Sequence, residues 1–355
     1  MIELLEQCVR IPSLSGQEQR VAEFLRDEML SRGFDKAFVD ESGSAVGIIG
    51  NGPKQLVMLG HMDTVGGDVP VRYEDNKLYG RGTVDAKGPL CAFILAVAQA
   101  RQIIANSQWQ IIVIGATEEE AASSRGAHYA ATQYQPELCI IGEPSGSDGI
   151  TLGYKGRLLA RAHFEQAIAH TSRPEPTSSE QAVNFWNWAK QFAEGYNADK
   201  PKMFDQVMPG LRSIKSGDNG LREWCDVTIG LRLPLTCGPD EIVQRFSAQF
   251  DLMGADEGCE LTFFGSEQAY RSSKDTVLAR AFVDAIREEK LRPVFKVKSG
   301  TADFNILGPA WNCPIVAYGP GDSDLDHTPI EHVEIDEFER GVRVLTRVLR
   351  ACILL

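Results

Sequence analysis

Five segments of the chain share one pattern, in which an apolar run of strand character is followed at once by histidine, aspartate or glutamate. These segments are QLVMLGHMDTV with His61 and Asp63, YGRGTVDAKG with Asp85, IIVIGATEEE with Glu118, Glu119 and Glu120, ELCIIGEPS with Glu143, and SDLDHTPIEH with His327. Open α/β sheets bind ligands at the carboxyl ends of their strands. We therefore expect these side chains to converge in the folded protein, although they lie far apart in the sequence.

Each of these motifs has an ordinary structural explanation when it is taken alone. A single histidine is usually a surface residue or a hydrogen-bonded residue of the core. Acidic residues after a strand often occupy the first turn of a helix, where the helix dipole favours negative charge, and an aspartate in a glycine-rich loop serves turn formation. The occurrence of all five motifs along one chain is what favours a functional site.

The order of the expected elements predicts two domains of different topology. Over residues 1–155 and 268–355, helices alternate with short apolar strands, the pattern of an α/β sheet with helices on its faces. Between them, residues 156–267 follow the order β-α-β-β-α-β of a ferredoxin-like module. We expect a catalytic α/β domain interrupted by a smaller inserted α+β domain. Near the N-terminus, Ser15 is the expected N-cap and Gly33 the expected end of a helix.

Length and composition exclude several classes of protein. A chain of 355 residues is too long for one ordinary core, and its net charge of −13 argues against nucleic-acid binding, which needs a basic surface. No uninterrupted apolar run approaches the ~20 residues that span a bilayer. The acidic N-terminus also differs from a secretion signal, so we expect a cytoplasmic protein without membrane association. The eight cysteines include no CxxC pair, which favours buried free thiols over a zinc finger or a redox motif.

The motifs HMDTV, GRGTVDAKG, TEEE, GEPS and DHTP together resemble the signature of the M20 metallopeptidases, and the resemblance extends over essentially the whole chain. This family includes aminoacylases, acetylornithine and succinyl-diaminopimelate deacylases, and glutamate-type carboxypeptidases. The resemblance implies a zinc-peptidase-like mixed sheet in the catalytic domain and an inserted domain that serves as a lid and dimerisation domain. It also implies a site for two divalent metal ions per chain, either two Zn²⁺ or Zn²⁺ with Co²⁺.

Matched to the motifs of the family, five residues are metal ligands. His61 and Glu143 bind one ion, Glu120 and His327 bind the other, and Asp85 bridges the two. Two divalent ions carry four positive charges, which three carboxylates and a bridging hydroxide balance. Mixed histidine and carboxylate ligands with an open coordination position suit catalytic zinc.

Two further carboxylates take catalytic roles in this match. Glu119 is the general base, and Asp63 stands behind His61 and fixes its imidazole ring. The family usually has Asp-Glu-Glu where this chain has three glutamates. A shifted register, with Glu118 as the base and Glu119 as the ligand, therefore stays open.

The resemblance also points to His170, in the segment IAHTSRP of the inserted domain, as the donor to the developing oxyanion. In the family this histidine typically reaches the active site of the neighbouring subunit, which implies a homodimer. The usual segment Gly-x-x-x-His-Ser is replaced here by Glu165-Gln-Ala-Ile-Ala-His170-Thr-Ser, which lacks the glycine.

Three segments, GEPSGSDGITLGYKG, VKSGTADFNILG and YGPGDSDLDHTPIEH, look closest to the lysine-biosynthetic members of the family. Those enzymes release lysine, and in some organisms ornithine, from the terminal glutamate of a small acidic amino-group carrier protein. Under this hypothesis Arg232 clamps the α-carboxylate of the product, Lys155 meets the acidic end of the carrier and Asp303 pairs with the lysine ammonium. Ser299, Gly300, Thr301 and Asn305 are expected on one loop that contacts the substrate backbone.

An acidic enzyme and an acidic carrier repel each other through their net negative charges. Binding therefore needs a local basic patch on the enzyme. The residues expected to form this patch are Lys155, Arg157, Arg161 and Arg173. The absence of such a patch would weaken the carrier hypothesis and favour free N-acyl amino acids as substrates.

Three alternatives remain beside the carrier hypothesis. The first is a small-molecule deacylase acting on N-acetyl-ornithine, N-acetyl-lysine or succinyl-diaminopimelate, and the second is a peptide-trimming M20 peptidase. The third is a catalytically silent homologue that binds amino-acid conjugates. The glutamate pair argues against the silent homologue, because losing the base is the simplest way to lose turnover.

Overall fold

The structure, a computed structural model, describes residues 1–170, 172, 174–253 and 258–354, and these form two compact units. Unit 1 comprises Met1–Gly153, Arg271–Val297 and Ala302–Leu355, and unit 2 comprises Tyr154–Tyr270 and Lys298–Thr301. The sequence predicts junctions after residues 155 and 267. It does not anticipate that the short segment Lys298–Thr301 belongs with unit 2.

Unit 1 is built around a mixed sheet with the strand order β1-β2-β6-β3-β7-β15-β8-β13, and β14 also pairs with β8. Its strands are β1 (Lys36–Val39), β2 (Ala45–Ile49), β3 (Lys54–His61), β6 (Trp109–Ala116), β7 (Leu138–Gly142), β8 (Gly149–Tyr154), β13 (Tyr270–Arg271), β14 (Val294–Lys298) and β15 (Ile315–Ala317). A smaller sheet has the order β16-β5-β4, with β4 (Arg72–Glu74), β5 (Lys77–Tyr79) and β16 (His332–Glu334). The helices are α1 (Ile2–Val9), α2 (Gln19–Ser31), α3 (Lys87–Ala105), α4 (Arg125–Gln133), α7 (Val277–Glu288), α8 (Phe304–Trp311), α9 (Ile335–Ile353) and the short η2 (Ser323–Leu325).

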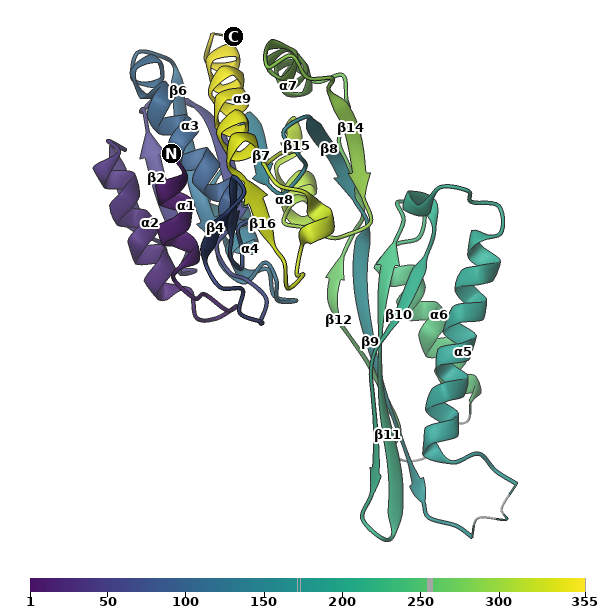
Figure 1. The fold of residues 1–355 in the computed structure, drawn as a ribbon. Coiled ribbons are helices and arrows are strands. Elements are labelled where there is room, and N and C mark those ends of the chain that lie inside the picture. Colours follow the sequence, from purple (N-terminus) through teal and green to yellow (C-terminus); the bar gives the residue numbers. More distant parts are fainter. Residues whose placement is uncertain (171, 173, 254–257, 355) are drawn as a thin grey trace. The chain divides into compact units, whose positions relative to one another are not determined.

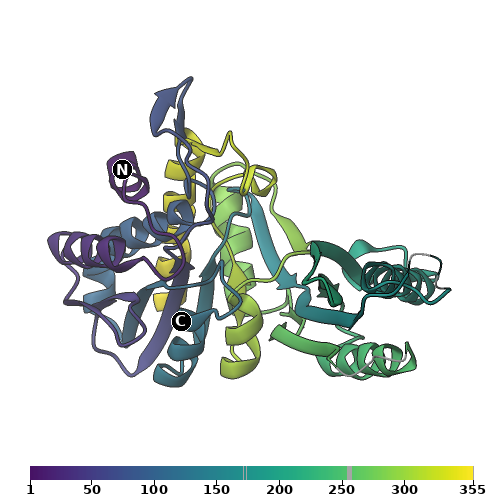
Figure 2. The same ribbon diagram turned by 90° about the horizontal axis from the view of Figure 1, so that it is seen from below.

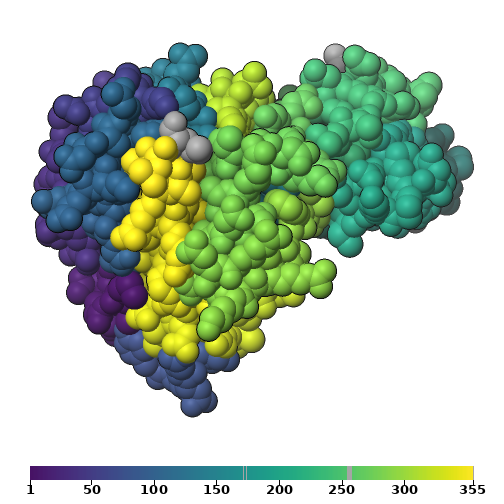
Figure 3. Space-filling view, turned by 90° about the horizontal axis from the view of Figure 1, so that it is seen from above, coloured from purple at the N-terminus to yellow at the C-terminus, as the bar shows by residue number. Residues whose placement is uncertain are grey.

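Helices cover both faces of the large sheet (Figures 1 and 2). Along β3, Leu56 and Met58 belong to a core shared with α1, α2, α3, α7 and α9, whereas Val57 and Leu59 face the other way and are equally buried. Successive residues of a strand point to opposite faces, so a strand that is buried at every position must be covered on both sides. On the outside of this core, α7 and α9 pack side by side (Figure 3). The predicted α/β class is confirmed.

The helix α3 is long and apolar enough to cross a bilayer by length and composition, which the sequence prediction did not recognise. In its most apolar window 67% of the residues are buried inside the protein. It contacts α9, β3 and β6, so its apolar surface is that of a central core helix.

Unit 2 contains a four-stranded antiparallel sheet in the described part of the chain, with the order β10-β11-β9-β12. Its elements are β9 (Gly156–Ala167), α5 (Ser178–Asn197), the short η1 (Met203–Asp205), β10 (Met208–Asp218), β11 (Arg222–Leu233), α6 (Pro239–Leu252) and β12 (Glu260–Glu267). The inward residues of β9 and β11 share a core with Phe185 of α5 and Phe246 of α6. The element order matches the predicted ferredoxin-like module, and the role of this unit as a lid and dimerisation domain stays a prediction.

The predicted start of the second helix is wrong. The helix begins at Gln19 after Glu18, and Ser15 lies outside it. The hydroxyl of Ser15 donates a hydrogen bond to Asp63 Oδ2 at 2.7 Å. A serine hydroxyl can cap a helix, but it can equally donate a hydrogen bond to a buried carboxylate. Here it bonds to Asp63, which lies 48 positions away in the sequence.

Candidate active site

The strand register brings three of the predicted motifs to one edge of the sheet in unit 1. Strand β3 runs parallel to both β6 and β7, with His61 level with Ala116 and Gly60 level with Gly142. His61 ends its strand, the three glutamates follow Ala116 after one residue, and Glu143 follows Gly142 directly. A Cβ at Gly142 would lie 3.0 Å from the Cα of Gly60, so the close approach of β3 and β7 requires glycine here.

Two groups of side chains at this edge have the composition of metal sites. His61, Asp85 and Glu143 offer ligand atoms that lie within 4.8 Å of one another, and Asp85, Glu120 and His327 do the same. Asp85 belongs to both groups: its Oδ1 lies 3.0 Å from His61 Nε2, and its Oδ2 lies 3.0 Å from His327 Nε2. The five side chains predicted as metal ligands are therefore brought together.

The three glutamates point in different directions. Glu120 Oε1 lies 2.9 Å from His327 Nε2, in the second group. Glu119 Oε2 lies 3.8 Å from His61 Nε2, beside the first group. Glu118 has a positive φ of 57° and accepts a hydrogen bond from Ser123 at 2.6 Å, away from both. This geometry favours Glu119 as the base and Glu120 as the ligand over the shifted register.

Asp63 organises the turn that carries these glutamates. Its two carboxylate oxygens accept hydrogen bonds from the backbone N–H groups of Glu119 and Glu120, both at 3.1 Å, and it is fully buried. Its Oδ1 lies 3.4 Å from His61 Nδ1, which also lies 3.0 Å from the Asp63 carbonyl oxygen. Asp63 thus fixes both an imidazole ring and the acidic turn opposite it.

The electrostatics of the group depend on burial and on the mutual contacts. Burial alone would lower the pKa of His61, but hydrogen bonds to Asp63 and Asp85 outweigh it and the pKa is raised well above its ordinary value. Hydrogen bonds to Asp85 and Glu120 raise the pKa of His327 to about 10. Burial, together with the charges of Glu143 and Asp303, raises the pKa of Glu119 well above its ordinary value. The His327 ring is thereby a positive counter-charge for the carboxylates of Asp85 and Glu120.

The donor set fits divalent metal ions. Clustered carboxylates repel one another unless a cation neutralises them, and here five side chains supply two histidine nitrogens and three carboxylates around one shared aspartate. Imidazole and carboxylate together suit Zn²⁺ and neighbouring divalent ions. His327 has a positive φ of 62°, a backbone conformation that is rare outside glycine and is found at functional positions.

The residues predicted to bind substrate fall into two groups. In unit 2, Arg232 Nη1 donates to Thr301 Oγ1 at 2.7 Å, and that hydroxyl donates to the Lys155 carbonyl oxygen at 2.9 Å. Ser299 and Gly300 lie on the loop just before Thr301. These contacts place the guanidinium of Arg232 beside this loop.

Lys155 does not lie where the hypothesis of an acidic partner expects it. Its side chain is buried, and its ammonium donates to the carbonyl oxygens of Met203, at 2.8 Å, and Gln206. Burial lowers its pKa to about 8. The ammonium is held inside unit 2 because two main-chain carbonyls replace its water, and it is not presented to a partner's surface.

The other residues expected in the basic patch are Arg157, Arg161 and Arg173, and the structure describes the first two. Arg157 donates to the carbonyl oxygen of Gly265 at 3.1 Å, and Arg161 lies over the ring of Phe264 with its guanidinium carbon 5.3 Å from the ring centre. Arg173 lies outside the described residues.

In unit 1, Asp303 and Asn305 are both buried. Asn305 lies in the first turn of α8 and not on the predicted loop, and its Oδ1 accepts from the N–H of Ala302 at 3.1 Å. The charge of Asp303 contributes to the raised pKa of Glu119. The loop prediction is wrong for Asn305, because helix α8 begins at Phe304 and its first turn is buried.

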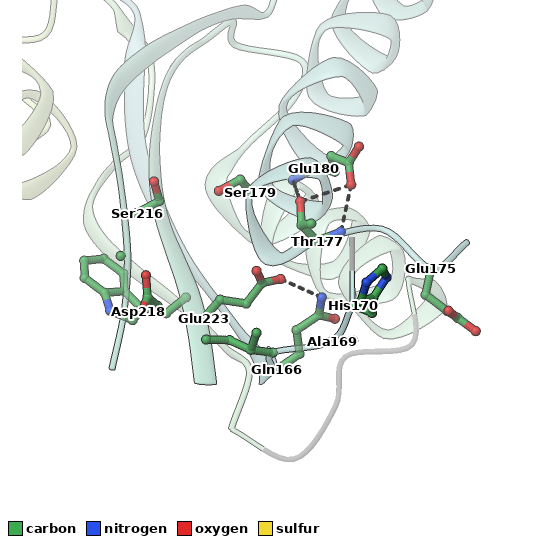
Figure 4. A pocket seen from close by; sticks show the side chains of 13 residues that line it. Gln166, Ala169, His170, Glu175, Thr177, Ser179, Glu180, Ser216, Asp218 and Glu223 are labelled. Carbon is green, nitrogen blue, oxygen red and sulfur yellow. Dashed lines mark hydrogen bonds between the residues drawn. The ribbon is translucent and has the colours of Figure 1, made fainter. Parts of the chain in front are cut away.

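His170 lies in unit 2, where it lines a pocket of about 570 Å³ at one end of the sheet (Figure 4). The side chain is exposed, and its Nδ1 lies 2.9 Å from Ser172 Oγ. Glu180 and Thr177, which form the capping box of α5, line the same pocket, as does Glu223, which accepts from Gln166.

The sequence prediction missed three residues that support the site, namely Ser15, Arg81 and Glu331. Glu331 is fully buried and accepts from backbone N–H groups of the loop that carries Asp85. In the sequence, the feature that pointed to Glu331 was its position four residues after His327. Its hydrogen bonds join residues about 250 positions apart, so they leave no pattern in the neighbouring sequence.

Comparison with known proteins agrees with this geometry. The model of the peptidase family M20/M25/M40 matches residues 57–351. The chain is 48% identical over 351 residues to a [LysW]-lysine hydrolase of Deinococcus radiodurans, with 98% of this chain and 95% of the relative covered. It is 27% identical over 345 residues to a [LysW]-lysine/[LysW]-ornithine hydrolase of Saccharolobus islandicus, with 96% and 92% covered.

The fold is also similar to a solved structure, the M20 family metallo-carboxypeptidase Sso-CP2 from Sulfolobus solfataricus. The TM-score is 0.78 at 16% identity, with 100% of this chain and 99% of that chain covered. The family match spans most of the chain and includes all five residues of the two metal groups. The resemblance of the motifs is therefore confirmed, and the chain belongs to the peptidase family M20/M25/M40.

Proposed function

We propose that the protein is a two-metal amide hydrolase that releases lysine, or ornithine, from the terminal glutamate of a small acidic amino-group carrier protein. The observation that carries the hydrolase is the pair of ligand groups that share Asp85, with the carboxylate of Glu119 beside them. The carrier substrate is supported by the 48% identity to a [LysW]-lysine hydrolase over nearly the whole of both chains.

The proposed chemistry needs one base and one proton path. When bound, the two divalent ions polarise the amide carbonyl and lower the pKa of water toward neutrality. Glu119 takes a proton from the attacking water and delivers it to the leaving amine nitrogen, so that one water is consumed and a carboxylate and an amine are formed. During this transfer Asp63 holds the backbone of Glu119, because its Oδ1 accepts a hydrogen bond of 3.1 Å from the Glu119 N–H.

Further side chains are proposed to bind the substrate. Arg232, whose guanidinium is oriented by Thr301, clamps the α-carboxylate of the released amino acid. Asp303 pairs with its side-chain ammonium, and Ser299, Gly300 and Asn305 line the path of its backbone. His170 stabilises the developing oxyanion of a neighbouring subunit, which makes the enzyme a homodimer through unit 2. The metal is Zn²⁺, which Co²⁺ can replace, and the enzyme acts in the cytoplasm.

The experiment that tests this proposal offers carrier-linked lysine and N-acetyl-lysine to the Zn²⁺-loaded enzyme side by side and compares kcat/KM. The proposal expects a clear preference for the carrier-linked substrate. A preference for N-acetyl-lysine would replace the carrier by a small-molecule substrate. Two bound ions without hydrolysis of either amide, or of a peptide, would favour the silent homologue.

A matched pair of variants controls this experiment. Glu119→Gln removes the proposed base, and Glu118→Gln makes the same change one residue earlier, at a side chain that contacts Ser123. Only the first is expected to abolish turnover, and both are expected to retain two ions.

A further inference from the structure

Glu331 is a buried carboxylate that the chemistry above does not use. It lies four residues after His327 and directly before β16, and its side chain has 0% exposure. Burial raises its pKa, and hydrogen bonds from Val84 and Asp85 act in the opposite direction. Carboxylates are almost never fully buried without partners, so its contacts indicate its role.

Among the described residues, its hydrogen bonds go to the loop between β5 and α3. Oε1 accepts from three backbone N–H groups, those of Gly82 at 2.9 Å, Val84 at 3.0 Å and Asp85 at 3.2 Å. Oε2 accepts from Arg81 Nη1 at 2.7 Å. The main chain adds a bond from the Gly80 N–H to the Glu331 carbonyl oxygen at 3.2 Å.

These bonds set the conformation of a loop that has no regular structure of its own. Gly82 has a φ of 86°, and a Cβ there would lie 2.9 Å from Thr64 Cγ2, so the loop is tightly packed. Three N–H groups of this loop, those of Gly82, Val84 and Asp85, donate to the one carboxylate oxygen. Leaving a buried donor unsatisfied costs about 1–3 kcal/mol. A carboxylate that receives them all, with Arg81 as its counter-ion, holds the loop in one arrangement.

Glu331 also links the two chain segments that carry Asp85 and His327, two ligands of one metal group. Strand β16, which Glu331 precedes, pairs with β5, with His332 opposite Tyr79 and Val333 opposite Leu78. Asp85 follows β5 on one side of this ladder, and His327 precedes β16 on the other. Both residues belong to the group that also contains Glu120. A change at Glu331 therefore moves two of the three ligands relative to each other.

We propose that Glu331 is a positioning residue that sets the place of the Asp85 carboxylate and thereby controls occupation of the metal group Asp85–Glu120–His327. The inference rests on the two-metal site proposed above. It concerns metal binding, so it is separable from the identity of the substrate.

The test titrates Co²⁺ into metal-free protein and follows the visible ligand-field spectrum. The proteins are the unaltered chain, Glu331→Gln, Glu331→Asp and the control Glu334→Gln, which changes an exposed glutamate three residues later. Glutamine loses the charge opposite Arg81, and aspartate keeps it but withdraws the oxygens from the loop. Changing a residue that orients metal ligands typically weakens binding about 10- to 100-fold. We expect that loss for one of the two ions in both Glu331 variants, with an altered spectrum, and none in the control.

Each outcome decides between the inference and its rivals. If the unaltered chain fails to bind two ions, the proposed function is wrong. If it binds two and the folded Glu331 variants bind both with the same affinity and spectrum, the inference is wrong. Thermal unfolding of the metal-free variants separates positioning from folding: loss of the folded state in both would also contradict the inference, because Glu331 would then hold unit 1 and not the loop.

Discussion

The metal site of unit 1 and the surroundings of His170 in unit 2 differ in how completely the fold arranges them. In unit 1, the ends of β3, β6 and β7 bring His61 and its partners together, and Asp63 fixes the ring and the acidic turn with bonds of 3.0–3.1 Å. In unit 2, His170 is exposed and lines a pocket (Figure 4). Its ring Nδ1 lies 2.9 Å from the hydroxyl of Ser172, only two residues away.

The ligands in unit 1 form a preformed site, whereas, among the described residues, His170 is held by few contacts of its own. A metal site needs its ligands in place before the ion arrives, because misplaced donors cost affinity. A donor to an oxyanion is needed only when the substrate is bound. The comparison predicts that changes at the metal ligands of unit 1 and at the residues that position them alter metal binding, whereas changes around His170 alter turnover and leave metal binding intact.

The largest expected effect is at the base. Glu119→Gln should lower kcat about 10²- to 10⁴-fold, because proton transfer by a positioned side chain contributes that much. Metal content, measured by atomic emission after dialysis, should stay at two ions per chain. Full activity with the glutamine variant, or equal loss in Glu118→Gln, would contradict the assigned register.

A somewhat smaller loss is expected at His170. His170→Ala should lower kcat about 10²- to 10³-fold, the usual effect of removing one oxyanion donor, with unchanged Co²⁺ binding. Loss of metal binding in this variant would remove the distinction between the two sites.

Mixing the two inactive variants sharpens the same comparison. If His170 serves the neighbouring subunit of a two-fold dimer, random exchange between Glu119→Gln and His170→Ala subunits restores about a quarter of the normal activity. If mixing restores nothing, either the histidine acts within its own chain or the dimer is absent, and analytical ultracentrifugation tells these apart.

The pH dependence of metal binding tests the protonation of the two ligand histidines in unit 1. The pKa of His61 is raised well above its ordinary value, and that of His327 is raised to about 10, so the His327 ring is protonated at pH 7. A ligand histidine must be neutral, so binding releases protons and the apparent affinity should rise with pH until about pH 10. Calorimetry of Zn²⁺ binding at pH 7 in buffers of different ionisation enthalpy measures this release. Binding without proton release would show that the rings are already neutral.

The smallest expected effect is on stability. Thr177, which lines the His170 pocket, accepts from the N–H of Glu180 in the capping box of α5. Thr177→Ala should lower the free energy of unfolding by about 1 kcal/mol, with no change in metal affinity. Urea unfolding measures the first quantity and Co²⁺ titration the second. Loss of metal binding in this variant would contradict the distinction between the two regions.

Residues that follow a strand were predictable from the sequence. His61, Glu120 and Glu143 stand at the ends of buried parallel strands, and the register that aligns them follows from the hydrophobic pattern. The order of elements in unit 2 was predictable for the same reason, because periodicity is local information.

Residues that act across the chain were not predictable in this way. Ser15 was assigned to a helix cap because nothing nearby reveals its bond to Asp63. Lys155 was placed at a surface because a lysine usually lies there, whereas the carbonyls of Met203 and Gln206 hold it inside. Asn305 was placed on a loop because the glycine and threonine before it suggested one, although helix α8 begins at Phe304.

The most direct test of the central claim is a crystal structure of the Zn²⁺-loaded protein with anomalous diffraction recorded at the zinc edge. The account predicts two peaks about 3.5–4 Å apart, with Asp85 between them, His61 and Glu143 on one ion, and Glu120 and His327 on the other. A single peak, or two ions that do not share Asp85, would contradict it.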